Sequence, residues 1–208
     1  MFVELLVPAL SNGARTSPGS RSRVVWTSSA ATYTASLDYA TFTPGAARDK
    51  VQSMALYGQS KLGNAVVACE AARRYADKDI VVVSVNPGIT KTVDISQHFP
   101  APMLWVIVRG LRPLCIHIQA GSLQPQRKVE VPPAFGALTQ LYAGTALEAA
   151  GANGKVCAQL RLSDDALTAA QFFVPRHKVG LTPPVALDVK QGVRLWEWLE
   201  RETKERGL

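Results

Sequence analysis

The sequence lacks several common signals, and the most informative absence is a glycine-rich G-x-G-x-x-G loop, which appears nowhere in its 208 residues. Such a loop is the usual cradle for the phosphates of a dinucleotide. The sequence also has only three cysteines, which are far from one another, and three histidines, which are likewise far from one another. Isolated residues of these types give neither metal-ligand spacing nor a disulfide framework, which suits a reducing compartment. We therefore predict no bound metal.

Signals for export and membrane insertion are absent as well. The N-terminal stretch MFVELLVPAL is apolar, but it contains Glu4 and no preceding basic residue, which argues against a signal peptide. The most membrane-like run, 102–118, is interrupted by Arg109 and Arg112, well short of the roughly 20 apolar residues that a span requires. The sequence therefore predicts no transmembrane span and a soluble, intracellular (cytoplasmic) location.

A clustered basic stripe is also missing, although the formal net charge is +7 and the pI is near 9.5. Proteins that bind nucleic acids concentrate their basic residues on one face, with aromatic residues interleaved where single strands are bound. The arginines and lysines here are scattered along the chain. We therefore predict no nucleic-acid partner and a solvated basic surface.

What is present is a pattern of buried strands and helices. Residues 23–29 (RVVWTSS) and 80–85 (IVVVSV) are apolar without alternation, as in strands that are buried on both faces. Residues 54–76 between them show helical periodicity, which makes a βαβ unit with parallel strands and a right-handed crossover. Residues 154–160 are a third strand candidate. The pattern predicts one α/β domain over residues 1–208.

Further helices are predicted at both ends of this unit. Residues 2–11 have a helical period that Asn12-Gly13 should end. A second helix should start after Pro132-Pro133 and run to about Ala150. The last helix should be capped by Asp188.

Two short patterns suggest chemistry. Tyr57 and Lys61 lie one turn apart on one face of the predicted helix, where the ammonium favours the phenolate and would make Tyr57 a general acid/base. Ser28 and Ser29 follow the first buried strand, where open parallel sheets place their ligands. Each pattern also has an ordinary interpretation, as a pair on a helix surface and as serines of a loop.

The ordered set of motifs is more specific than any one of them. RVVWTSS, then YGQSKLGNA, then IVVVSVNPG resembles the C-terminal half of the short-chain dehydrogenase/reductase superfamily. The longer stretches YGQSKLGNAVVACEAARRY, VNPGITKT and ALTQLYAGTALEAAGANGKV are most similar to its retinol-dehydrogenase-like members. The resemblance implies a Rossmann-like, doubly wound parallel sheet with flanking helices.

The resemblance also implies roles for particular residues. Ser29 matches the catalytic serine, Tyr57 the proton donor/acceptor, and Lys61 the residue that binds the nicotinamide ribose. The turn that faces the nicotinamide would comprise Pro87, Gly88, Ile89 and Thr92.

The activity implied by the resemblance is that of an oxidoreductase using NADP or NAD, with NADP slightly favoured. Its substrate would be a small alcohol or the corresponding ketone or aldehyde. The family's glycine-rich loop and first strands have no counterpart here, so we expect a partial Rossmann-fold domain that binds cofactor weakly. The alternative is a truncated, inactive fragment that acts at most as an interaction subunit. A strand at 23–29 without one neighbour would have an unpaired edge, which leaves homo-oligomer formation open.

Overall fold

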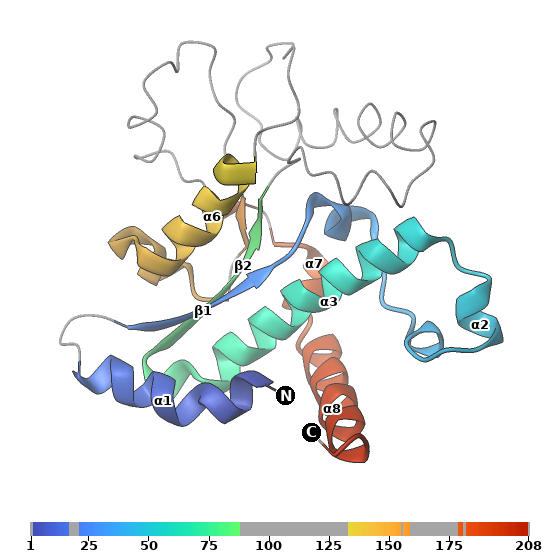
Figure 1. The fold of residues 1–208 in the computed structure, drawn as a ribbon, viewed down its shortest axis with the longest axis horizontal. Coiled ribbons are helices and arrows are strands. Elements are labelled where there is room, and N and C mark those ends of the chain that lie inside the picture. The colour runs from blue at the N-terminus through green and yellow to red at the C-terminus, as the bar shows by residue number, and fades with distance from the viewer. Residues whose placement is uncertain are drawn as a thin grey trace, which may run out of the picture.

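The protein forms an α/β structure around a small sheet (Figure 1). The computed structural model describes residues 2–16, 21–87, 133–154, 156–158, 179–180 and 182–207. The strands lie in the order β1 (Ser22–Thr27), β2 (Ile80–Asn86), β3 (Val156–Ala158) and β4 (Val179–Gly180). The first three are parallel, as the sequence predicts, with shorter bounds for the third than 154–160. The antiparallel β4 was not predicted.

The crossover between β1 and β2 is the long helix α3 (Ser53–Arg74). It corresponds to the helix predicted over 54–76. Its predicted stripe is buried, with Leu62, Ala65 and Val66 all at 0% exposure. The connection from β1 to α3 has three short helical segments, η1 (Ala30–Thr34), η2 (Tyr39–Thr41) and α2 (Ala46–Asp49).

Helices cover both faces of the sheet (Figure 1). Side chains alternate along β2, so Val81, Val83 and Val85 pack with Ala143 of α6 (Pro133–Thr145) on one face. On the other face, Ile80 and Val82 pack against α3, together with Val7 and Leu10 of α1 (Phe2–Thr16). The burial of β2 between helices on both faces holds α3 against the sheet.

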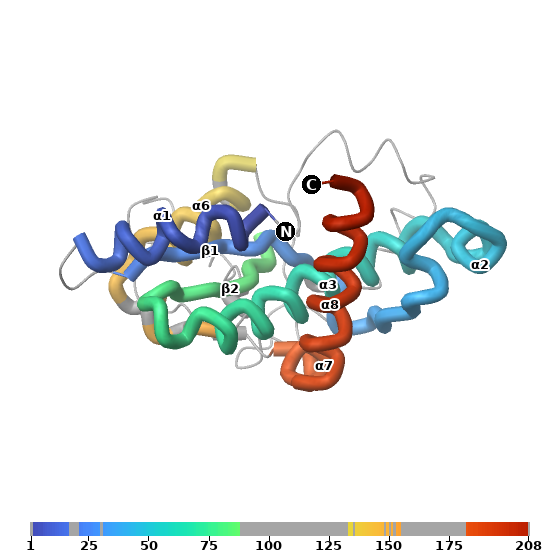
Figure 2. Tube along the Cα trace, turned by 90° about the horizontal axis from the view of Figure 1, so that it is seen from below, coloured from blue at the N-terminus to red at the C-terminus, as the bar shows by residue number. Residues whose placement is uncertain are grey.

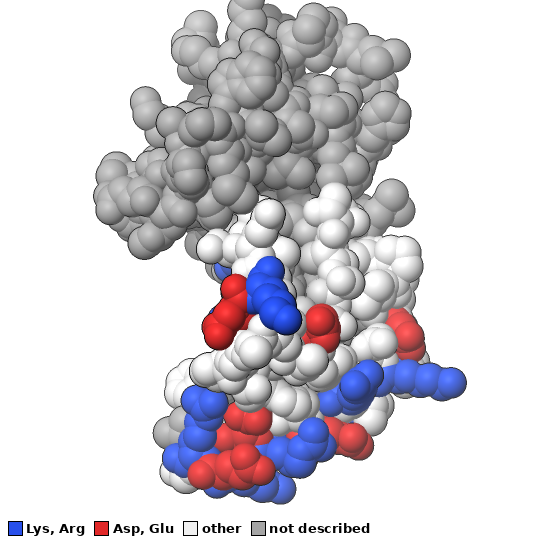
Figure 3. All heavy atoms as spheres, turned by 90° about the vertical axis from the view of Figure 1, so that its right-hand side faces the viewer, with Lys and Arg blue, Asp and Glu red and all other residues white. Residues whose placement is uncertain are grey.

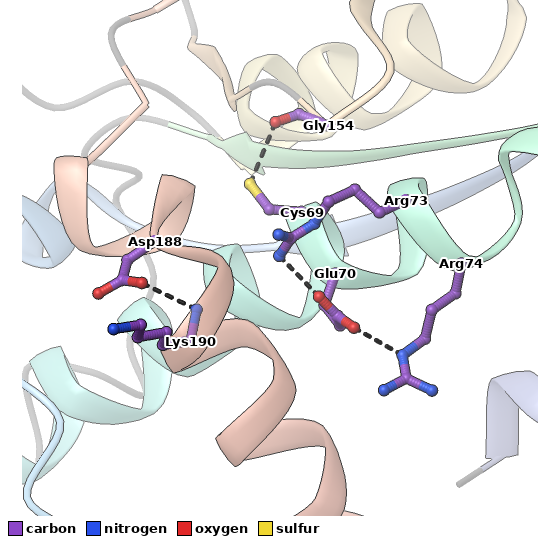
Figure 4. A network of polar contacts seen from close by, with 7 residues as sticks. All are labelled: Cys69, Glu70, Arg73, Arg74, Gly154, Asp188 and Lys190. Atoms are coloured by element: carbon purple, nitrogen blue, oxygen red, sulfur yellow. Dashed lines mark hydrogen bonds and ion pairs between the residues drawn. The ribbon is translucent and has the colours of Figure 1, made fainter.

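The C-terminal helices α7 (Pro184–Leu187) and α8 (Val189–Glu205) pack on α3 (Figure 2). Asp188 caps α8, as predicted, by accepting a hydrogen bond of 2.8 Å from the Lys190 N–H (Figure 4). Trp196 is 1% exposed in the shared core.

The contact between α3 and α8 depends on a buried carboxylate and a glycine (Figure 4). Glu70 accepts from Arg73 at 2.6 Å and from Arg74 at 2.7 Å. Gly192 lies directly over this cluster, where a Cβ atom would be 2.5 Å from Arg73 Nη2 and 2.8 Å from Glu70 Oε2. The missing side chain of Gly192 therefore permits the close approach of the two helices.

Two predicted helix ends were wrong. Asn12-Gly13 does not end α1, which continues to Thr16 because Gly13 keeps an ordinary helical backbone and the Thr16 hydroxyl donates to the Asn12 carbonyl (3.1 Å). The helix predicted to reach Ala150 ends at Thr145, because Ala146 is extended (ψ 136°) and the 3-10 segment η4 (Leu147–Ala152) follows.

Two features of the described surface bear on the predicted partners. No described helix combines the length and the apolar character that crossing a membrane requires, and the run 102–118 lies outside the described residues. On the face in Figure 3, basic and acidic side chains are intermixed across the described part of the surface. The described part of that face therefore has no basic stripe.

Candidate active site

The candidate site lies where β1 and β2 both reach their carboxyl ends. Thr27 and Val85 are register partners in the parallel pair, and the Ser28 N–H donates to the Val85 carbonyl at 2.7 Å. Ser28 and Ser29 therefore lie beside the end of β2, which Pro87 follows. Ligands of open parallel sheets bind at this edge.

The first half of α3 brings polar side chains to the same edge. Lys61 Nζ lies 3.4 Å from the Thr27 carbonyl oxygen, and Asn64 Nδ2 donates to that oxygen at 2.8 Å. Lys61 Nζ is also 5.7 Å from the centroid of the Tyr57 ring. The i, i+4 spacing in the sequence thus places the Tyr57 ring and the Lys61 ammonium close together at the end of β1.

The two serines have different hydrogen bonds. Ser28 is 2% exposed, and its Oγ donates to the Lys61 backbone carbonyl at 2.8 Å, which ties the end of β1 to α3. Ser29 is the N-cap of η1, and its Oγ accepts from the Ala31 N–H at 3.3 Å. Because Ser29 accepts there, its own hydroxyl hydrogen is left to donate to another group.

Close packing of α3 on η1 also shapes the site. A Cβ atom at Gly58 would lie 3.2 Å from the Ala35 Cβ and 3.4 Å from the Ala31 carbonyl oxygen. A larger residue would push the helix turn that carries Tyr57 away from η1. Gly58 and Asn64 were both missed by sequence reasoning, although their positions one and three residues from Tyr57 and Lys61 were a usable signal.

The structure describes part of the predicted site. Ser29, Tyr57, Lys61 and Pro87 lie within the described residues. The remaining three members of the predicted turn lie outside them, namely Gly88, Ile89 and Thr92. The roles of all these residues stay predictions.

The buried thiol of Cys69, away from this edge, is not suited to nucleophilic chemistry. Burial raises the pKa of the Cys69 thiol to about 11, with a smaller opposing effect of Arg73. The thiol also donates to the Gly154 carbonyl at 3.1 Å (Figure 4). Since the thiolate is the reactive form, this cysteine is inert at neutral pH.

The fold and the polar edge define an α/β protein with a Tyr–Lys pair at the carboxyl end of a parallel sheet. The chain is 36% and 34% identical to two short-chain dehydrogenases/reductases of Armillaria gallica, each match covering 98% of this chain and 54% of the relative. An oxidoreductase of Penicillium decumbens is 28% identical over 95% of the chain. These relatives support membership of the short-chain dehydrogenase/reductase superfamily.

A solved structure shares the fold, and the chain covers only part of the length of its relatives. The crystal structure of an uncharacterized protein from Mycobacterium paratuberculosis matches with a TM-score of 0.53 and 19% identity, over 88% of this chain and 50% of that one. A comparison with protein-family models found no match. The chain spans about half the length of the curated relatives it matches. The retinol-dehydrogenase-like subtype stays a prediction.

Proposed function

We propose that the protein forms part of an NAD(P)-dependent oxidoreductase, which interconverts a small alcohol and its ketone or aldehyde. The observation that carries this proposal is the placement of Lys61 Nζ 3.4 Å from the Thr27 carbonyl, with the Tyr57 ring 5.7 Å away, at the carboxyl edge of a parallel sheet. A phenol beside an ammonium at this edge suits proton transfer to or from a bound substrate.

Tyr57, Ser29 and Ser28 have separate tasks in this proposal. In the oxidation, Tyr57 takes the proton of the alcohol oxygen, and in the reduction it returns that proton to the carbonyl oxygen. Ser29 donates its free hydroxyl hydrogen to the substrate oxygen and so orients it. A bound nicotinamide would supply the two-electron chemistry of the reaction, as the acceptor or the donor of hydride. Ser28, whose hydroxyl is engaged by the Lys61 carbonyl, holds the end of β1 in place.

The chain's residues fit the nicotinamide end of such a cofactor. An ammonium has three donors, so Lys61 can bind ribose hydroxyls in addition to the Thr27 carbonyl. We assign the nicotinamide-facing turn to Pro87 with Gly88, Ile89 and Thr92. The printed sequence has no glycine-rich loop for the phosphates, so we propose that another polypeptide segment supplies those contacts.

The proposal predicts weak cofactor binding by this chain alone. Losing about 4 kcal/mol of phosphate contacts weakens binding roughly a thousandfold. The measurement is a fluorescence titration of the 208-residue chain with NADPH and with NADH. Micromolar binding would show that the phosphate contacts lie within this sequence.

Turnover is best tested in a chimera in which this chain replaces the matching part of the Armillaria gallica relative. We expect Tyr57→Phe to lower kcat by about 10²–10⁴-fold and to leave the cofactor Kd almost unchanged, because only the proton-transfer group is lost. Tyr39→Phe is the control, since its hydroxyl lies near Gln191 of α8 and not at the strand edge. An inactive chimera beside an active relative, or full turnover by Tyr57→Phe, would reject the proposal.

A further inference from the structure

The carbonyl oxygen of Thr27, at the end of β1, accepts hydrogen bonds from two side chains of α3. Asn64 Nδ2 donates to it at 2.8 Å, and Lys61 Nζ lies at 3.4 Å. A carbonyl oxygen has two lone pairs, so it can accept from both donors at once. The bond from Asn64 has an ordinary length, whereas the bond from Lys61 is longer than the usual range for N–H···O bonds. Asn64 is therefore the main partner of this oxygen, and Lys61 is only weakly bound to it.

Two hydrogen bonds of opposite direction join the end of β1 to α3. The Ser28 hydroxyl donates to the Lys61 backbone carbonyl, and the Asn64 side-chain amide donates to the Thr27 carbonyl. Thr27 and Ser28 are consecutive residues, and Lys61 and Asn64 are neighbours on the helix surface at i, i+3 spacing. Because these two bonds hold the strand end, the Lys61 ammonium is not needed for that purpose.

The Lys61 ammonium would have a different environment without the amide of Asn64. A carbonyl oxygen that loses its neutral donor accepts more strongly from a nearby cation, and charge-assisted bonds contract to about 2.7–2.9 Å. The lysine side chain is long and flexible enough to follow. Nζ would then move toward β1, and its distance of 5.7 Å from the centroid of the Tyr57 ring would no longer be maintained.

We propose that Asn64 is a positioning residue of the candidate active site. By engaging the Thr27 carbonyl, it keeps the Lys61 ammonium beside Tyr57 and available to the ribose of the nicotinamide cofactor. The inference rests on the proposed function of Lys61 and adds a residue to which the sequence motifs gave no role. In the alternative, Asn64 only fastens α3 to β1, and its loss affects stability alone.

The first test is a double-mutant cycle in the chimera with the Armillaria gallica relative. Asn64→Leu keeps the approximate size of the side chain but removes the donor, and we expect it to raise the cofactor Kd about tenfold, the effect of one hydrogen bond. It should have no such effect when Lys61 is already replaced by Met, because Asn64 acts through the ammonium. Fluorescence titration with NADPH and with NADH measures each Kd.

Gln59→Leu is the matched control, because it removes another side-chain amide of the same helix. The Gln59 amide donates to the Thr41 hydroxyl at 2.9 Å and accepts from the Asp38 N–H at 2.7 Å, so its partners lie at η2 and not at the end of β1. We expect this variant to lower stability in urea denaturation and to leave the cofactor Kd almost unchanged. An equal rise in Kd for Gln59→Leu and Asn64→Leu would overturn the proposal, in favour of a general loss of structure.

NMR of the 208-residue chain gives a readout that needs no cofactor. With lysine isotope-labelled at Cε, the signal of Lys61 is the one that disappears in Lys61→Arg. We expect Asn64→Leu to shift this signal and Gln59→Leu to leave it in place. An unchanged Lys61 signal in Asn64→Leu would overturn the inference.

The two tests separate this inference from the proposed function. If Lys61→Met weakens cofactor binding by the chimera but Asn64→Leu does not, the inference on Asn64 is wrong and the proposed function stands. If Lys61→Met does not weaken binding, the proposed role of Lys61 is wrong, and the NMR signal still decides whether Asn64 positions its ammonium.

Discussion

The two halves of α3 differ in burial and in task. In the half from Leu62 to Ala72, the residues that face the core are 0–7% exposed, and even Glu70 is 4% exposed. In the half from Ser53 to Lys61, only Gly58 is buried. The buried half packs in one core with residues of β2, α7 and α8, whereas the other half lies against η1 at Gly58. One helix thus anchors itself with one half and presents Tyr57 and Lys61 with the other.

Stability and candidate chemistry are therefore separated along a single helix. Substitutions of core-facing residues in the second half should act on the free energy of unfolding. Substitutions at Tyr57 should act on turnover.

Leu62→Ala should lower the free energy of unfolding by about 3 kcal/mol, because it leaves a cavity at a side chain with 0% exposure. Leu56→Ala is the matched control in the first half, where the side chain is only part-buried. We expect it to cost less than about 1 kcal/mol. Urea denaturation measures both. Equal losses would contradict the assignment of the anchor to the second half.

Gly192→Ala should destabilise the protein by about 1 kcal/mol. Its Cβ would crowd Arg73 and Glu70, which costs about 1–3 kcal/mol, and the better helix propensity of alanine offsets about 1 kcal/mol. Gly63→Ala is the control, because its Cβ would meet only Leu195 Cδ2, at an ordinary 3.9 Å. It should stabilise by up to about 1 kcal/mol. Thermal denaturation would show opposite shifts in Tm, and a stabilising Gly192→Ala would refute the crowding argument.

The smallest effect at neutral pH is expected at Tyr75, the C-cap of α3. Burial raises the pKa of its hydroxyl to about 12, with a further increase due to Glu4 and Glu200 and a decrease due to Arg74. The folded state therefore keeps a proton that the unfolded state loses, so stability is full below pH 10.0 and falls as pH rises toward about 12.

Tyr75→Phe should remove this part of the alkaline loss. At neutral pH it should change stability by less than about 1 kcal/mol, because the buried hydroxyl has no hydrogen-bond partner among the described residues. Urea denaturation at a series of alkaline pH values measures the slope. An unchanged slope in the variant would contradict the assignment to Tyr75.

Much of the fold was predictable because it depends on local patterns. The unbroken apolar runs at 23–29 and 80–85 and the stripe on α3 predicted parallel strands around a crossover helix, and the structure confirms this. The ends of α1 and α6 were not predictable from their glycines. They depend on hydrogen bonds of Thr16 and Thr145 with the preceding turn, and in α1 on the approach of Ser22 to Gly13.

The amino-acid sequence was enough to predict the pairing of Tyr57 with Lys61, because helical spacing fixes which side chains share a face. It also determined that Ser28 and Ser29 follow a buried strand. That Ser28 donates to the Lys61 carbonyl, whereas Ser29 accepts from the Ala31 N–H, was not predictable, since it depends on where α3 crosses the end of β1. The tertiary structure also decided that Gly192 lies over Glu70 and that α1, α3 and α8 border one groove beside β1. Contacts between segments so distant in the chain depend on tertiary packing, which local sequence patterns do not predict.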